Sequence, residues 1–243
     1  SLSQVQRALK GLVVMSADLE DVGVAMVDGK VPMAWSKAAY PSRKPLGAWV
    51  NDLLLRLDFL RQWFDAKRAP NTFWISGFYF TQAFITGTLQ NYARKYKLPI
   101  DTVAFDYAIL TEDEEARAEK PQDGAVCTGL FLEGARWDAA SHVLAESRPR
   151  ELHTPLPAFH MLPKPKHAIP DITGQPDLYT GSIDGTAHVY SCPVYKESTR
   201  QGTLSTTGHS TNFVMFLRLP MAPHHTQKHW IKRGVAMLTQ LDV

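Results

Sequence analysis

The spacing of apolar residues changes at Pro99, and this change limits the folds that the sequence can adopt. Before Pro99, apolar side chains recur every three or four residues over long stretches, as amphipathic helices require. After Pro99, they come in short runs separated by turn residues, which is typical of strands. The sequence therefore predicts an α+β protein, with an N-terminal helical module at residues 1–100 and a small antiparallel β-barrel at residues 101–243.

Three long helices are predicted in the first module. The first starts with the chain and ends near "DGK" at 28–30, and its apolar seam consists of Leu2, Val5, Leu9, Leu12, Leu19 and Met26. The second runs from about Pro45 to "KRAPN", with an apolar stripe of Leu46, Val50, Leu53, Leu57, Leu60 and Phe64. The third, from about Tyr79 to Lys97, is expected to be largely buried because its first turns are apolar on several sides.

Six apolar runs after Pro99 predict strands. They are "TVAFDYAIL", "AVCTGLFLEG", "AFHMLP", "HVYSCPVY", "TNFVMFLRLP" and "GVAMLTQL". In the fifth run Phe213, Met215, Leu217 and Leu219 alternate with Asn212, Val214, Phe216 and Arg218, which predicts a strand with one face in a core. Gly/Pro-rich turns between such strands favour a small barrel or sandwich. The charged segment 111–124 and the proline-rich segment 163–177 are predicted to be exposed loops.

Charge and cysteine content exclude several classes of protein. The net charge is +2, which argues against non-specific nucleic-acid binding, and it divides into +6 for residues 1–100 and −4 for residues 101–243. Two cysteines, Cys127 and Cys192, are too few for a disulfide framework and are predicted to be packed thiols. The apolar run 73–89 is too short and too polar to span a bilayer. A sequence that begins in helical register without Met is expected to be part of a longer one.

The apolar seam of the first helix is the candidate packing interface. It is longer than a helical module of this size needs to cover itself, so one reading is that Leu2, Val5, Leu9, Leu12, Leu19 and Met26 pack on a neighbour outside this sequence. The other reading is a helical hairpin with residues 46–64. The two readings are compatible.

The stretch "RQGTLSTTGHSTNF", residues 200–213, invites a catalytic reading. Gly202 and Gly208 lack the spacing and the lysine of a phosphate-binding loop. A nucleophile elbow would need a second glycine where Asn212 stands. We expect a turn and strand entry; the alternative is a small serine hydrolase that uses Ser210 or Ser205 with His209.

Metal and acid–base sites are not expected. His225 and His229 of the run His224, His225 and His229 could share a helix face, but no acidic residue lies within that run to complete a zinc site. Asp113, Glu114 and Glu115 are contiguous in a predicted loop, where they are hydrated and unsuited to general acid–base work.

Several long stretches carry a resemblance to one family. In order along nearly the whole sequence they are "LKGLVVMS", "YPSRKPLGAWVNDLLLRL", "FWISGFYFTQAFITGTLQNYARKYKLPID", "GLFLEGARWD", "CPVYKES", "RQGTLSTTGHSTNFV" and "HWIKRGVAMLTQLD". Together they resemble the C-terminal domain of dynein heavy chains. The "GLFLEGARWD" and "GTLSTTGHSTNFV" segments are more similar to the axonemal branch than to the cytoplasmic one.

The resemblance implies a non-catalytic structural and regulatory segment. In that family it follows the sixth AAA+ module of the motor ring, and a helical part lies along the ring and leads into a small β-barrel. The implied partners are the AAA+ modules of the same heavy chain, in a cilium or flagellum, without nucleic acid or membrane. A separate hypothesis is an adaptor-binding β-barrel, which recruits another axonemal protein through the loops 111–124 and 163–177. ATP, Mg²⁺ and microtubule binding belong to other parts of such a motor. No catalytic, cofactor-binding or metal residue of the family maps onto this sequence, so none is expected.

Overall fold

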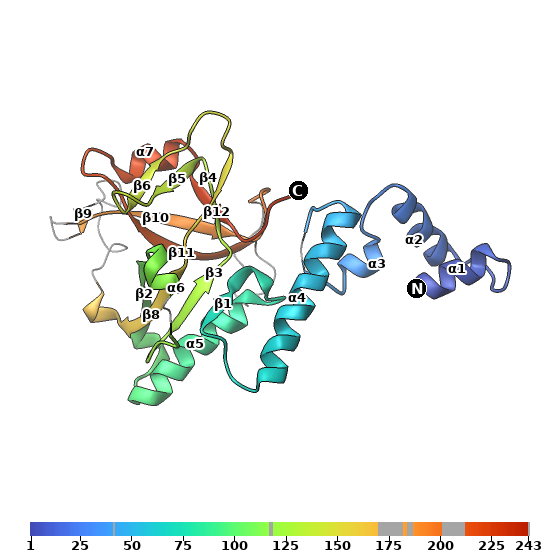
Figure 1. Cartoon of the computed structure of the whole chain (residues 1–243), viewed down its shortest axis with the longest axis horizontal. Coiled ribbons are helices and arrows are strands. Elements are labelled where there is room, and N and C mark those ends of the chain that lie inside the picture. Colours follow the sequence, from blue (N-terminus) through green and yellow to red (C-terminus); the bar gives the residue numbers. More distant parts are fainter. Residues whose placement is uncertain (41, 117–118, 170–181, 184–186, 201–211, 243) are drawn as a thin grey trace.

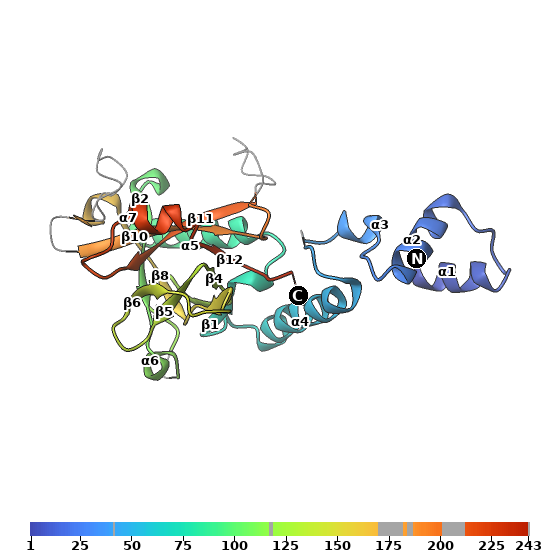
Figure 2. The same cartoon turned by 90° about the horizontal axis from the view of Figure 1, so that it is seen from above.

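The computed structural model describes residues 1–40, 42–116, 119–169, 182–183, 187–200 and 212–242. In two perpendicular views the molecule is elongated (Figures 1 and 2). The first helices lie at one end, the sheets lie at the other, and a long helix runs between them. Among the described helices, none combines the length and the apolar composition that crossing a bilayer requires.

The predicted first helix is two helices, and the prediction of a single one is wrong. Helix α1 spans Leu2–Leu9 and helix α2 spans Ala17–Val27. Gly11 ends α1 in the left-handed conformation (φ 71°), and the N–H groups of Gly11 and Leu12 bond back to the carbonyls of Ala8 and Arg7. Ser16 then caps α2 by accepting a hydrogen bond from the Leu19 N–H. The apolar spacing of three and four residues continues across the break between α1 and α2, so the sequence pattern does not reveal the break.

The remaining N-terminal elements are helical except for the short strand β1, which the sequence did not predict. They are α3 (Met33–Ser36), α4 (Leu46–Ala66), β1 (Thr72–Trp74), the 3₁₀ turn η1 (Ile75–Gly77), α5 (Thr81–Tyr96) and the 3₁₀ turn η2 (Ile100–Thr102). The second and third predicted helices, α4 and α5, are confirmed. Helix α5 is not largely buried, however, because it packs on the sheets with one face, which includes Ile85 and Ala93, and leaves other positions exposed.

The described strands form three sheets. The first has the order β1-β3-β8-β2, with β2 at Val103–Ile109, β3 at Ala125–Thr128 and β8 at Phe159–Pro165. The second has the order β11-β10-β12-β4-β7, with β4 at Phe131–Glu133, β7 at His153–Pro155, β10 at Ala187–Tyr195, β11 at Phe213–Pro220 and β12 at Ala236–Leu238; β9 (Ser182–Ile183) pairs with β10. The third is the hairpin of β5 (Ala135–Asp138) and β6 (Val143–Glu146). Short helical segments α6 (Glu112–Ala116), η3 (Lys166–Ala168) and α7 (Gln227–Lys232) complete the described elements.

The α+β class is confirmed, and each of the six apolar runs contains a strand. A closed barrel is not confirmed, because no sheet closes on itself within the described residues. Nor are the described sheets purely antiparallel, since β1 pairs with β3 and β10 pairs with β12 in parallel. Strand β1 comes from the segment predicted as helical and joins a sheet of the later segment, so the division at residue 100 stays a prediction. The predicted loop 111–124 contains α6. In the predicted loop 163–177, residues 163–165 belong to β8, residues 166–168 form η3, and residues 170–177 lie outside the described residues.

The core lies between the sheets. The alternation predicted along β11 is confirmed from Met215 to Leu219, because Met215, Leu217 and Leu219 are buried and Phe216 is exposed. It does not hold at the start of the strand, where Phe213 is half-buried and Val214 is buried. Cys127 and Cys192 are buried free thiols, as predicted. Burial raises the pKa of both thiols far above the ordinary range, so they stay protonated and unreactive.

A buried arginine joins the helices to the sheets. Arg56 of α4 is 2% exposed and pairs with Asp52 one turn earlier, Nε to Oδ2 at 2.6 Å. Its guanidinium lies over the Tyr40 ring, 3.7 Å from Cζ to the ring centroid, and 5.5 Å from the Trp74 ring. It also donates to the Phe78 carbonyl at 3.4 Å. One side chain therefore holds together the segment before α4, α4 itself and the residues around η1.

Aromatic packing extends the same joint. Phe59 and Trp63 of α4 meet Phe73 and Phe78 edge-to-face, with ring centroids 5.3–6.2 Å apart, and Phe78 stacks on Phe84 of α5 at 4.5 Å. The strand end at Trp74 lies so close to Gly129 that a Cβ on Gly129 would come within 2.4 Å of the indole. The helices are thus attached to the first sheet by side-chain packing as well as by β1.

Replacement of Arg56 tests this joint. Arg56→Met should lower the free energy of unfolding by about 3 kcal/mol, because it leaves the largely buried Asp52 without its counter-charge. Urea denaturation of the variant and wild-type proteins measures the difference. The matched control is Arg61→Met on an exposed position of the same helix, which should change stability by less than about 0.5 kcal/mol. Equal effects of the two substitutions on the free energy of unfolding would contradict the proposed contribution of Arg56 to this joint.

Candidate interaction surface

Exposed apolar side chains gather at the N-terminal end of the molecule. Most of the large apolar residues that are exposed in the described part of the protein precede residue 65. On α1, α2, their connection and the start of α3 they are Leu2, Leu9, Leu12, Val14, Met15, Val24, Val27 and Met33; on α4 they are Leu54, Leu55, Leu57 and Phe64. Isolated exposed apolar residues are common on monomers, but a concentration of them on one end marks an interaction surface.

The six predicted interface residues do not all remain accessible. Leu2, Leu9 and Leu12 are exposed, with Leu9 at 73%. Leu19 and Met26 are half-buried. Val5 is buried instead, and a Cβ on Gly23 would be in van der Waals contact with it at 3.9 Å.

Helices α1 and α2 pack on one another and form what we call the arm, residues 1–30. The hairpin with residues 46–64 that the sequence left open is not what the structure shows, because α1 finds its partner in α2 and the arm projects beyond α4 (Figure 1). Few contacts hold the arm. Trp35 donates to Ser1 Oγ at 2.9 Å, the Leu46 N–H donates to the Gly29 carbonyl at 2.8 Å, and Trp35 stacks on Trp49.

The arm buries little of its own apolar surface. In the arm as described, Val5 and Val22 are the buried apolar residues. Two short helices that bury one side chain each gain little from packing, since isolated helices of this length are marginal in water. The arm therefore has an apolar surface to offer to a further partner.

Helix α4 turns a different face inward from the one its leucines predict. The inward residues are Trp49, Arg56, Phe59 and Trp63, spaced by three, four and seven. The predicted stripe is displaced by about one position from this face, so Leu57 and Phe64 are exposed, Phe64 at 81%. Helix α4 is apolar over a wider arc than the sheets cover.

A shallow cleft of about 400 Å³ lies between α5 and the segment 120–125. Its walls include Trp63, Phe73 and Phe84. Lys95 Nζ and Tyr96 Oη both donate to Asp123 at 2.7 Å and tie α5 to that segment. The cleft is therefore explained by the packing of α5 against the sheet.

The candidate catalytic residues gain no structural support. Ser205, His209 and Ser210 lie outside the described residues, so the hydrolase alternative stays a sequence hypothesis. Glu114 and its neighbours lie exposed on α6. Hydrogen bonds from the Thr111 N–H and Oγ1 hold the pKa of Glu114 below its ordinary value, whereas a general acid needs a raised pKa.

The histidine run has an acidic neighbour that sequence reasoning missed. Glu146, at the end of β6, lies beside His225 and His229, although it is remote from them in the sequence. His224 is exposed, and its ring lies beside that of His225 at a tilt of 50°, with centroids 4.1 Å apart. No local sequence pattern predicts that Glu146 lies near the histidines, because its position depends on how the β5–β6 hairpin packs against the segment before α7.

Comparison with known proteins agrees with the resemblance read from the sequence. Residues 1–239 match the family described as the C-terminal domain of dynein heavy chains. The protein is 48% identical over 242 residues to dynein axonemal heavy chain 1 of Mus musculus, and 50% identical over 242 residues to dynein axonemal heavy chain 3 of Homo sapiens. Each alignment covers 100% of this sequence but 5% of the relative's length, so the sequence matches a small part of these long proteins. This protein belongs to the family of C-terminal domains of dynein heavy chains.

Proposed function

We propose that this protein is a non-catalytic structural and regulatory segment of an axonemal dynein heavy chain, which packs against the AAA+ modules of the same polypeptide and modulates microtubule-based motility in cilia or flagella. Family membership and the names of its axonemal relatives support the motor context. The concentration of exposed apolar side chains on the arm and on α4 carries the packing part of the proposal.

The energetic argument rests on these side chains. Fully burying one leucine or valine contributes roughly 1.5–3 kcal/mol. Covering Leu9, Leu12 and Val27 would therefore contribute several kcal/mol toward docking, because all three are more than half exposed. Docking to modules of the same polypeptide also avoids most of the entropy loss of bimolecular association.

In this proposal, the catalytic chemistry of the motor belongs to other parts of the heavy chain. ATP and Mg²⁺ would bind in the ring of the parent heavy chain, and the segment described here would hold neither. The division at residue 100 and the closure of the later sheets into a barrel remain parts of the proposal. The segments 111–124 and 163–177 are the proposed contacts for other axonemal proteins.

Charge introduced on the arm should undock it. In the whole heavy chain, Leu9→Asp combined with Leu12→Asp should abolish packing, because a carboxylate cannot be buried there without a partner. We expect amide hydrogens of α1 and α2 to exchange slowly in the wild-type motor and at least tenfold faster in the variant. Leu152→Asp is the matched control, since Leu152 is as exposed as Leu9 (75% against 73%) but lies in the segment between β6 and β7. Fast exchange in the wild-type arm would contradict docking.

Removal of residues 1–243 from the heavy chain tests the proposed regulatory function. A heavy chain that ends before residue 1 should keep microtubule-stimulated ATPase activity within about twofold, because the hydrolytic residues are proposed to lie in the ring. Gliding velocity, force or processivity should change. If the ATPase activity collapses and the ring dissociates, the segment is a structural support and the regulatory proposal is wrong.

A further inference from the structure

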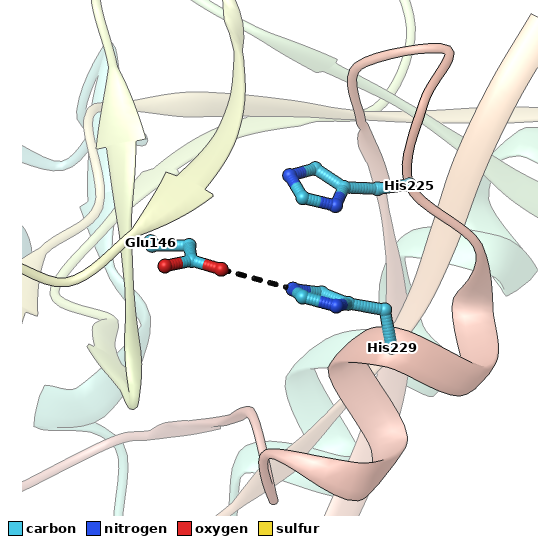
Figure 3. Close-up of side chains that lie close together, drawn as sticks. All are labelled: Glu146, His225 and His229. Atoms are coloured by element: carbon cyan, nitrogen blue, oxygen red, sulfur yellow. Dashed lines mark ion pairs between the residues drawn. The ribbon is translucent and has the colours of Figure 1, made fainter.

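Three potential metal ligands converge on one side of the sheets. Glu146 ends strand β6, His225 precedes helix α7, and His229 lies within α7 (Figure 3). One donor atom from each residue lies within 4.8 Å of the other two. Figure 3 shows the carboxylate and the two imidazoles facing a common space.

The fold holds these side chains in place. A parallel bridge between Leu144 and Met221 brings β6 beside the segment that leads to α7. Thr226 caps α7 by accepting from the His229 N–H, which fixes where that helix starts. The rings of His225 and His229 stack with centroids 4.3 Å apart. The fully buried indole of Trp230 lies edge-to-face to both, at 4.9 and 4.8 Å, and forms an apolar wall behind them.

The contacts of His229 leave a ligand atom unsatisfied. Its Nε2 lies 3.2 Å from Glu146 Oε1. This nitrogen is nevertheless buried and, within the described part of the protein, makes no hydrogen bond of acceptable geometry. A buried polar atom without a hydrogen bond needs another partner, and a metal ion would provide one.

The charges at the site both favour and oppose a cation. Glu146 favours a cation, because its Oε1 lies 3.2 Å from His229 Nε2 and its carboxylate faces the same space as the two imidazoles (Figure 3). Arg233 opposes binding, because its Nη1 lies 3.1 Å from Glu146 Oε1 and competes for the carboxylate. Arg233 and Glu146 are both partly exposed, at 40% and 48%, so their ion pair can open toward solvent.

We propose that Glu146, His225 and His229 form a binding site for a divalent transition-metal ion, with Zn²⁺ the best match. Two imidazoles and one carboxylate are a zinc ligand set, whereas Ca²⁺ and Mg²⁺ require oxygen ligands throughout. Tetrahedral zinc, with bonds of roughly 2.0–2.2 Å, places its ligand atoms about 3.3 Å apart. Glu146 Oε1 already lies 3.2 Å from His229 Nε2, so the remaining approach, roughly 1.5 Å at most, must bring His225 and the other two ligands together.

Bound metal would cross-link β6 to α7. Three protein ligands leave one position for water or for a donor from a neighbouring protein. The inference concerns residues of this protein alone and is independent of the motor function proposed above.

Titration of Zn²⁺ into the protein by isothermal calorimetry tests the proposal. We expect one ion per molecule and a raised melting temperature with zinc present. His225→Ala or His229→Ala should weaken binding on the order of 100-fold, and Glu146→Gln should weaken it at least tenfold. Loss of a residue that only hydrogen-bonds to a metal ligand already costs about 10–100-fold in affinity, and loss of the ligand itself costs at least as much. Circular dichroism of the metal-free variants checks that they fold.

Two matched variants separate this site from adventitious binding. His224→Ala removes an exposed neighbouring histidine that is outside the three-residue group and should leave the affinity unchanged. Arg233→Gln removes the competing cation and should strengthen binding several-fold. Co²⁺ should also quench the fluorescence of Trp230, and Trp230→Phe should remove that component of the quenching. Absence of binding, equal loss with His224→Ala, or unchanged affinity in Glu146→Gln would overturn the proposal.

Discussion

The desolvated guanidinium of Arg56 is the constraint on which the arrangement of this molecule depends. A charge at 2% exposure persists only when its hydrogen bonds and its counter-charge are supplied, and here they come from Asp52, the Phe78 carbonyl and two aromatic faces. Those groups belong to different stretches of the sequence. Satisfying one arginine therefore orients α4 against η1 and, through β1, against the first sheet.

The arm lies beyond the reach of that joint and is held differently. Its helices bury one valine each, whereas α4 and α5 share an aromatic cluster with the sheet. An element with so few internal contacts is stabilised mainly by whatever it docks against, and it opens at low free energy when undocked. This contrast is the physical basis of the proposed function, in which the arm responds to its partner while the sheets stay folded.

The histidine cluster illustrates the limit of local reasoning. His225 and His229 were visible from their spacing, but a run of three histidines without an acidic residue gives little reason to expect a metal site. The third ligand, Glu146, belongs to a hairpin whose position depends on the Leu144–Met221 bridge. Such long-range pairing is decided by packing, and a single sequence does not display it.

The sequence by itself determined the type and order of the long helices and of most strands. The 3–4 and alternating periodicities identified α4, α5 and the strands, because each period commits one face to burial. The ordered motifs identified the family. Only the tertiary structure decided that α1 and α2 separate at Gly11, that α4 buries Trp49 and Arg56 while Leu57 and Phe64 are exposed, and that β1 joins a sheet in parallel. Each of these three features depends on packing against segments that are distant in the sequence. Periodicity shows that one face of a helix or strand is buried, but the neighbouring segment in the folded structure decides which face that is.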